Sequence, residues 1–350
     1  MSNARSVTAG PLEAYCTSGS SPGVTSLHLV GPGRVGRALL RCLAGGPVRL
    51  VAVSDSRGTL RSPGGLDPRR TAELKERTGR VAPERRALSP ALLRAVGADL
   101  VVDATATALH RTDWYDLLEQ GVLDRGATLV LAAKDGLRAR AERWTAPPLA
   151  GRVRFNAVLG GAGEDLRAEL PELRSRAHTV AIGGNASTTA IVRAVEAGGS
   201  LEDGIAAAGE AGLLEADPEL DLRGVDAAVK LAIVAGAVWG RSVEPATIPC
   251  DDIRDVDPEI LRERARRGRT TRLIGRRDPT GRLSVRYEEV ARGSLLDVPS
   301  DRVAYLYGLR EGGERLHVGD GLGPDGTARA LLRDVEACLQ PATATAEVAR

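Results

Sequence analysis

Apolar runs of strand length alternate with segments of helical periodicity over the first part of the chain. Residues 24–31 form one apolar run, and the glycines of GPGRVG follow it directly. A helical pattern continues over RALLRCLAGG, and a second apolar run, VRLVAVSD, ends at Asp55. This order predicts a strand, a glycine loop, a helix and a second strand, which is the opening of a doubly wound parallel α/β sheet of the Rossmann type.

The glycines of this loop have the GxGxxG spacing of dinucleotide-binding turns. Such glycines permit a tight turn and a close approach to a pyrophosphate, which the N-terminus of the next helix then faces. The alternative is a structural glycine turn in an unrelated α/β unit. A strand precedes the loop and a helix follows it, so we predict that residues of the loop and of the helix start bind NAD(P). These residues are Gly31, Gly33, Arg34, Val35 and Gly36.

The end of the second strand carries conflicting signals about the cofactor. Asp55 lies 19 residues after the third glycine, where an acid hydrogen-bonds the adenosine ribose and favours NAD. Arg57 lies two residues further on and can pair with the 2′-phosphate of NADP, or else is an exposed loop residue. Both residues are therefore predicted cofactor contacts, and the preference between NAD and NADP stays open.

Two later apolar runs, at 98–107 and 127–137, end in small residues. The carboxyl ends of parallel strands share one edge of a sheet, and ligands bind along that edge. We therefore predict that Ala104 and Thr105 contact the cofactor and that Lys134 lies where nicotinamide and substrate meet. The simpler alternative for Lys134 is a strand-end side chain that points into water.

Past residue 150 the chain carries glycine-broken strand runs and an alanine-rich helical run, which predict a second α/β catalytic domain with a mixed sheet. The helical run, from about Val225 to Trp239, is apolar on every side, as in a buried helix. The predicted organisation is a disordered leader, a Rossmann domain, a catalytic and dimerisation domain, and a segment that returns to the Rossmann domain, over residues 1–23, 24–150, 151–304 and 305–340.

Acids crowd the start of the predicted buried helix, and one lysine lies within it. Asp226 falls in the first turn and Lys230 four positions later, on the same face. Apolar neighbours predict that Lys230 is partly buried, and a buried charge needs partners. We interpret the group as an ionisable cluster beside a cleft. The alternative is a dipole-stabilising acid in a surface ion pair.

Lysine is scarce in this chain. Lys and Arg total 48, but only Lys75, Lys134 and Lys230 are lysines. A lysine ammonium can exchange a proton, whereas a guanidinium remains charged. Lys134 and Lys230 are therefore candidates for proton chemistry, with chance as the alternative, while Lys75 is predicted to be an ordinary exposed helix lysine.

Composition and charge exclude several classes of partner. The formal net charge of +2 favours no polyanion, and the Arg-dense stretch 262–277 lacks aromatic residues, so we expect an exposed helix and strand rather than a nucleic-acid site. There is neither an apolar run of about 18 residues nor an N-terminal signal pattern. Four scattered cysteines and four scattered histidines predict a reduced, cytoplasmic protein without a metal site.

The segment GLLEADPELDLRGVDAAVKLAIVA resembles the substrate-binding and catalytic segment of the homoserine dehydrogenases. The resemblance runs from about residue 24 to 340 and includes GPGRVGRALL, LVLAAK, the GGNASTTAIV segment and GPDGTARALLRDV. It implies an NAD(P)-dependent dehydrogenase that reduces L-aspartate 4-semialdehyde to L-homoserine and forms homodimers through the second domain. The family's regulatory ACT domain has no counterpart in this sequence, so the resemblance is to a short form.

The resemblance also implies roles for individual residues. The catalytic residues would be Lys134, Lys230 and Asp226. The substrate-binding residues would be Glu215, Asp221 and Ser187. In such a site a lysine ammonium stabilises and protonates the aldehyde oxygen. Carboxylates hold the α-ammonium of the small amino-acid substrate and thereby orient the aldehyde.

The chain departs from the family pattern near the substrate. Ala133 stands where an Asn usually precedes the lysine, and Ala186 and Ser187 stand within the usual Asn-Gly-Thr-Thr turn. Leu213 replaces a common Tyr, and Asn156 replaces an acid of a segment that binds a monovalent cation in some members. These departures leave open a specialised relative that acts on another small semialdehyde or hydroxy amino acid. The third alternative is a non-catalytic NAD(P)-binding protein, against which the retained acids and lysines argue.

Overall fold

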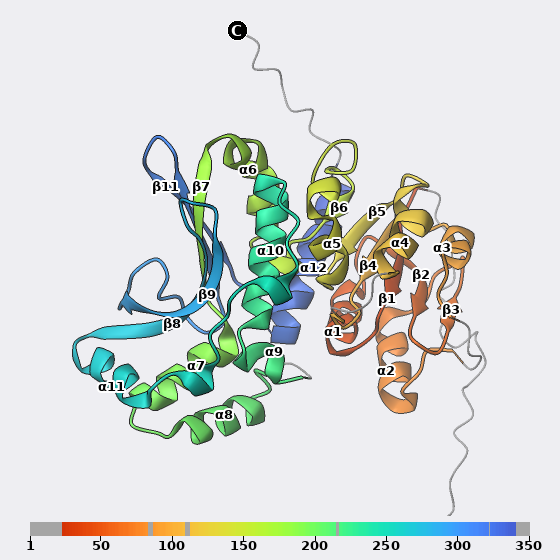
Figure 1. Cartoon of the computed structure of the whole chain (residues 1–350). Coiled ribbons are helices and arrows are strands. Elements are labelled where there is room, and N and C mark those ends of the chain that lie inside the picture. Colours follow the sequence, from red (N-terminus) through yellow and green to blue (C-terminus); the bar gives the residue numbers. More distant parts are fainter. Residues whose placement is uncertain (1–22, 83–86, 109–112, 215–216, 322, 341–350) are drawn as a thin grey trace, which may run out of the picture. The chain divides into compact units, whose positions relative to one another are not determined.

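The computed structural model describes residues 23–82, 87–108, 113–214, 217–321 and 323–340 (Figure 1). These residues form two compact units. The first unit contains the chain up to Ala133, Gly151–Phe155 and the chain from Ala328 onward; the second contains Lys134–Ala150 and Asn156–Thr327. The predicted leader lies outside the described residues apart from Gly23.

The first unit is built on a six-stranded sheet whose strand order reverses between β1 and β4. In spatial order the strands are β3 (Thr59–Arg61), β2 (Arg49–Ser54), β1 (Ser26–Val30), β4 (Leu100–Asp103), β5 (Thr128–Leu131) and β6 (Val153–Arg154). All neighbours pair in parallel except β3, which pairs antiparallel with β2. Every residue of β1 and β4 is buried, as expected for central strands covered on both faces. The predicted doubly wound sheet is therefore present.

Helices connect these strands, as the crossovers of a parallel sheet require (Figure 1). They are α1 (Arg34–Leu43), α2 (Pro68–Thr78), α3 (Pro90–Val96), α4 (Trp114–Leu118) and the π-helix η2 (Glu119–Leu123). Helix α2 begins where the Asp67 side chain accepts from the N–H of Arg70, and it ends at Gly79 in the left-handed conformation. Helix α12 (Gly323–Leu339) begins in the second unit, and its residues from Ala328 onward belong to the first.

The second unit contains a five-stranded sheet with the order β11 (Glu314–Gly319), β10 (Val303–Leu309), β7 (Ala177–Gly183), β8 (Arg269–Arg277) and β9 (Leu283–Ala291). The sequence predicts a mixed sheet here, but all five strands pair antiparallel. The parallel contact is confined to an isolated bridge between Cys250 and Val285. Strand β8 has six consecutive buried residues, as a strand of a parallel sheet usually does, so its apolar pattern does not reveal its antiparallel pairing.

The second unit also carries most of the helices (Figure 1). They are α5 (Asp135–Trp144), α6 (Gly163–Arg176), α7 (Ala186–Glu196), α8 (Leu201–Glu210), α9 (Glu219–Leu222), α10 (Val225–Trp239) and α11 (Pro258–Arg266). Short turns of 3₁₀-helix lie at η3 (Ala157–Leu159), η4 (Pro245–Thr247) and η5 (Ile253–Asp255). The Arg-dense stretch forms α11 and β8, so the predicted helix and strand are present.

Helix α10 is the core of the second unit. Its residues from Ala227 to Val238 are all buried, and it packs on β7, β8, β9 and α5. A Cβ atom placed on Gly236 would lie 2.8 Å from that of Ala141, so glycine permits the close approach of α10 to α5. This packing brings the N-terminal end of α5 towards the first turn of α10.

The observed division differs from the predicted boundaries in two places. Helix α5 belongs to the second unit because it packs on α10, whereas β6 returns to the first sheet beside β5. Strands β10 and β11, which fall mostly in the predicted returning segment, belong to the second sheet. Within the predicted returning segment, the part that belongs to the first unit begins at Ala328.

Candidate active site

A pocket of about 620 Å³ opens at the carboxyl ends of β1, β2 and β4 in the first unit. Its walls come from the glycine loop, the end of β2, the end of β4, α2 and the start of α4. Five of the predicted cofactor residues line it: Gly31, Gly33, Asp55, Ala104 and Thr105. The pocket lies where the strand order reverses, which is where open α/β sheets bind their ligands.

The three glycines of the loop serve different purposes. Gly31 has φ +89°, and a Cβ atom there would lie 2.5 Å from the backbone nitrogen of Thr105. A Cβ atom on Gly36 would lie 2.3 Å from the carbonyl oxygen of Gly31, so this glycine permits close packing of helix on strand. Gly33 faces open space, which a bound pyrophosphate would fill.

Arg34 and Val35 begin helix α1 and, with Gly36, form its first turn. They are predicted cofactor residues, but their side chains are not among those that line the pocket. The first N–H groups of a helix have no acceptor within it, so these residues can contribute through the backbone. Together with the open space at Gly33, the turn fits the phosphates of a dinucleotide.

Both carboxylate oxygens of Asp55 accept hydrogen bonds from groups of the protein. Its Oδ1 accepts from the backbone N–H groups of Arg57 (2.8 Å) and Gly58 (3.0 Å). Its Oδ2 accepts from Lys75 Nζ (2.7 Å) and from the N–H of Val81 (3.0 Å). Burial raises the pKa of Asp55, but Lys75 and the backbone donors outweigh burial and lower the pKa below its usual value.

The prediction that Lys75 is an ordinary exposed lysine is therefore wrong. Its side chain is largely buried, pairs with Asp55 and lines the cofactor pocket. The Arg57 side chain is exposed and does not line the pocket. Of the two cations near Asp55, Lys75 is the one that lines the pocket.

Sequence reasoning missed most of the other residues that line this pocket, among them Ser54, Lys75 and Trp114. The Oγ atom of Ser54 lies 2.7 Å from Nε2 of the fully buried His28 and 2.7 Å from Oγ1 of Thr59. Two signals could have found the others, since Lys75 is one of three lysines and Trp114 one of three tryptophans.

The second unit brings together the three predicted catalytic residues. Lys230 Nζ lies 2.8 Å from Oδ2 of Asp226, and Lys134 Nζ lies 3.3 Å from Oδ1. Lys134 precedes α5, and the other two residues lie in the first two turns of α10, so the packing of α5 on α10 creates the cluster. One carboxylate therefore holds two ammonium groups.

The cluster is shielded from solvent. Lys230 is 6% exposed, and the side chain of Asp226 is 11% exposed. Burial raises the pKa of Asp226, but the charges of Lys230 and Lys134 outweigh burial and hold its pKa well below its usual range. Asp226 is therefore ionised at neutral pH.

A second polar group surrounds Asp221, which is 4% exposed and five positions before Asp226. The hydroxyl of Ser187 lies 3.0 Å from Oδ1 of Asp221 and 2.6 Å from Oδ1 of Asn185. Asn185 begins helix α7, where its Oδ1 accepts from the N–H of Thr188 (3.0 Å), and its Nδ2 donates to Asp221 (3.4 Å). The predicted residues Asp221 and Ser187 thus meet, while Glu215 lies outside the described residues.

The polar group around Asp221 and the cluster around Asp226 can each take part in binding or reaction of a substrate. A buried carboxylate, Asp221, can hold a small cationic group. Two ammonium groups that share Asp226 can stabilise negative charge on an oxygen and supply a proton to it. The second unit therefore has the donor set for reaction at the carbonyl of an amino-bearing substrate.

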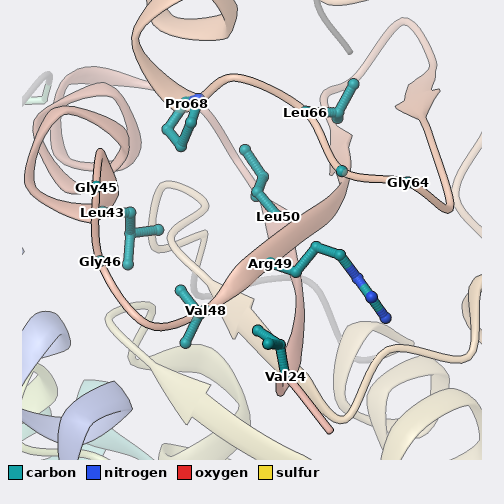
Figure 2. Close-up of a pocket in the computed structure, with 11 residues that line it drawn as sticks. Val24, Leu43, Gly45, Gly46, Val48, Arg49, Leu50, Gly64, Leu66 and Pro68 are labelled. Carbon is teal, nitrogen blue, oxygen red and sulfur yellow. The ribbon is translucent and has the colours of Figure 1, made fainter. Parts of the chain in front are cut away.

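A smaller hollow of about 220 Å³ lies in the first unit near the amino ends of β1 and β2 (Figure 2). Four of its eleven lining residues are glycines, and Arg49 is the charged residue among them. It is away from the strand ends that carry the predicted site residues, and we assign it no role in the reaction.

In the described part of the chain, no group of three or more His, Cys, Asp or Glu side chains is placed to hold a metal ion. None of the helices in this part is both long and apolar enough to cross a membrane.

The chain is similar in sequence to several known proteins. The family profile described as homoserine dehydrogenase matches residues 174–335. A homoserine dehydrogenase of Methanocaldococcus jannaschii is 28% identical over 82% of this chain and 88% of its own length. An NAD(+)-dependent homoserine dehydrogenase of Pseudomonas canavaninivorans is 26% identical over 91% of this chain and 97% of its own length.

A solved structure shares the fold. It is a hyperthermophilic archaeal homoserine dehydrogenase in complex with NADPH, with a TM-score of 0.72 and 23% identity. The match covers 91% of this chain and 98% of that chain. The likeness therefore extends over both the pocket-bearing unit and the unit with the lysine cluster.

Proposed function

The chain belongs to the homoserine dehydrogenase family, and on this premise we propose that it reduces L-aspartate 4-semialdehyde to L-homoserine with NAD(P)H. The observation that carries the proposal is the buried cluster of Lys134, Asp226 and Lys230. Two ammonium groups reach the same carboxylate of Asp226, so both lie beside one point of the site. Ammonium groups placed in this way can donate hydrogen bonds to a substrate oxygen that becomes negative.

The substrate is a small amino acid, so its α-ammonium needs an anionic partner. We assign this role to Asp221, supported by Ser187 and Asn185, and to Glu215. A buried carboxylate binds an ammonium through charge-assisted hydrogen bonds. Fixing the amino end restricts the position of the aldehyde at the other end of a four-carbon molecule.

At the aldehyde end, Lys230 and Lys134 donate hydrogen bonds to the carbonyl oxygen. When bound, the reduced nicotinamide supplies the hydride to the aldehyde carbon. Lys230, the more buried lysine, then gives its proton to the alkoxide oxygen, which becomes the hydroxyl of homoserine. Asp226 stays ionised and holds both ammonium groups in place throughout.

The pocket of the first unit binds the dinucleotide through Gly31, Gly33 and the first turn of α1. The Asp55–Lys75 pair decides between the cofactors. A free acid would repel the 2′-phosphate of NADP, but here Lys75 neutralises Asp55. We therefore propose that the protein accepts NADPH as well as NADH.

The substrate-side departures from the family favour a second candidate within the same reaction type. Ser187 and Ala186 occupy the turn that shapes the Asp221 site. A specialised relative would use the same lysines on another small semialdehyde or hydroxy amino acid. Turnover of that compound in preference to aspartate semialdehyde would identify it.

We also propose that the protein is a cytoplasmic homodimer. Leu316 and Val318 point to the same face of the edge strand β11 and are 37% and 38% exposed, so a second copy could cover them. No disulfide links Cys42, Cys250 and Cys338, consistent with a reducing compartment. Light scattering coupled to gel filtration would measure the mass, and a Leu316→Glu variant should shift a dimer towards monomer.

The decisive experiment is a direct assay. Purified protein is mixed with L-aspartate 4-semialdehyde and either NADPH or NADH, and absorbance at 340 nm is followed. Lys230→Met should lower kcat by at least about a hundredfold while the variant still binds NADPH. Unchanged turnover in a folded Lys230→Met protein would refute its role as proton donor. Cofactor binding without turnover by the wild type would move the proposal to the specialised relative.

A further inference from the structure

A buried carboxylate, Asp103, connects two walls of the dinucleotide pocket. Asp103 is the last residue of β4 and is 1% exposed. Its Oδ1 accepts from the backbone N–H of Thr105 (3.1 Å) and from the hydroxyl of Thr105 (2.7 Å). Its Oδ2 accepts from the indole Nε1–H of Trp114 (2.7 Å). One side chain thus fixes both the turn after β4 and the first residue of α4.

Both groups held by Asp103 face the pocket. Thr105 lines it and also abuts Gly31, whose Cβ would lie 2.5 Å from the Thr105 nitrogen. Trp114 lines the same pocket, and so does Leu117 one turn further along α4. The indole therefore forms an aromatic wall whose orientation depends on a hydrogen bond to a buried charge.

The position of this wall indicates which part of a dinucleotide it meets. The pocket is lined from the ends of β2, β1 and β4, and none of its described lining residues comes from the end of β5. In a doubly wound sheet the pyrophosphate crosses at the glycine loop and the adenosine lies on the β2 side. The pocket is therefore the adenosine half of the site.

We propose that Trp114 stacks against the adenine ring and that Asp103 is a positioning residue that holds the indole in the stacking orientation. This inference rests on the proposed NAD(P) binding but not on the identity of the reduced substrate. An adenine ring is flat and largely apolar on its faces, so a fixed indole loses little conformational entropy when it binds one. Without its acceptor the indole loses the hydrogen bond that sets its orientation in the pocket wall.

Two conservative variants remove this hydrogen bond from opposite sides. Asp103→Asn is isosteric, but an amide has one acceptor oxygen, so either the Thr105 donors or the Trp114 donor loses its partner. Trp114→Phe keeps an aromatic ring and removes the N–H. Each should raise the Kd for NADPH, measured by its fluorescence enhancement, by about tenfold.

The double variant tests the coupling. If Asp103 acts through Trp114, Asp103→Asn/Trp114→Phe should bind NADPH about as well as either single variant, not a hundredfold more weakly than wild type. Trp114→Ala removes the wall itself and should raise the Kd by about thirtyfold. ADP-ribose, which lacks nicotinamide, should lose affinity by the same factor as NADPH in each variant.

A matched control is available in the second unit. Trp239 also donates its Nε1–H in one hydrogen bond, to the carbonyl of Ala177 (3.0 Å), and lies outside the pocket. Trp239→Phe should leave the Kd for NADPH within about twofold of wild type. A structural role for Asp103 would lower the melting temperature without changing the Kd of the folded protein.

Equal Kd values in wild type, Asp103→Asn and Trp114→Phe would overturn the inference while leaving the proposed reaction intact. Additive losses in the double variant would also overturn it, since the two residues would then act independently. A wild type that binds NADPH but does not reduce aspartate semialdehyde would instead refute the proposed substrate. In that case the Kd values of NADPH for the Asp103 and Trp114 variants still test the proposed adenine stacking.

Discussion

The ammonium nitrogen of Lys75 lies 2.7 Å from Oδ2 of Asp55, the acid at the end of β2. Only 4% of the Asp55 side chain is exposed, and both of its oxygens accept from protein donors. Asp55 occupies the position of the acid that usually binds an adenosine ribose. Its negative charge is already balanced by Lys75 in the protein without a cofactor. The charge at this end of the pocket depends on a lysine from α2 rather than on the neighbouring Arg57.

Lys75→Met should shift cofactor preference towards NADH. Without the ammonium, Asp55 faces the pocket as an uncompensated charge, and the 2′-phosphate of NADPH is repelled. We expect the ratio of kcat/KM for NADPH to that for NADH to fall by about tenfold. Steady-state kinetics with both cofactors measure the ratio.

The control for this variant is Arg77→Met, which removes an exposed cation from the same helix but does not touch the pocket lining. It should leave the ratio nearly unchanged. An equal loss with both cofactors in Lys75→Met would mean that Lys75 supports the fold of the pocket and does not select the cofactor.

Local patterns made part of the site predictable. The glycine loop and its strands are contiguous in sequence, and Asp226 and Lys230 are four positions apart on one helix, so their proximity follows from helical geometry. The meeting of Lys134 with Asp226 depends on the packing of α5 on α10, across 92 positions. No periodicity encodes such a contact, and the family resemblance was needed to anticipate it.

Other features escaped prediction because they depend on tertiary structure. Lys75 lies in a highly charged helical segment that looks exposed, yet its partner Asp55 is 20 residues away, directly after β2. The direction of the strands in the second sheet depends on how distant runs pair. The Asp103–Trp114 hydrogen bond joins a strand end to a helix start, and neither residue has a spacing that marks it.

Asp226→Asn should impair both stability and catalysis. Its loss leaves the buried ammonium groups of Lys134 and Lys230 without their shared counter-ion. Removing one partner of a buried ion pair costs about 3–5 kcal/mol. Urea unfolding should show a loss of this size, and kcat should fall by at least about a hundredfold.

The double variant Asp226→Asn/Lys230→Met distinguishes the ion cluster from a packing defect. Because it removes one buried cation together with the anion, it should be more stable than Asp226→Asn alone. A double variant that is less stable by the sum of the single effects would show that the charges do not interact energetically.

Asp221→Asn should weaken substrate binding more than it slows the chemical step. The neutral amide loses the charge-assisted bond to the substrate ammonium but retains the shape that contacts Ser187 and Asn185. We expect KM for the semialdehyde to rise by about thirtyfold. The exposed Asp217→Asn is the matched control, since it lies in the same acidic segment and should leave KM unchanged. A fall in kcat at constant KM would contradict the proposed role of Asp221.

His28 should make the protein lose stability in mild acid. Burial, with a smaller contribution from Arg125, lowers the pKa of His28 from 6.5 to about 3. Below pH 6.5 the unfolded chain binds a proton that the folded protein excludes, so the free energy of unfolding falls with pH until about pH 3. Between pH 8 and pH 5 this single group should lower it by about 2 kcal/mol. His28→Gln does not titrate and should reduce the pH dependence by that amount in urea unfolding. Parallel curves for wild type and variant would contradict this, because they would show that His28 binds its proton at the same pH in the folded and unfolded states.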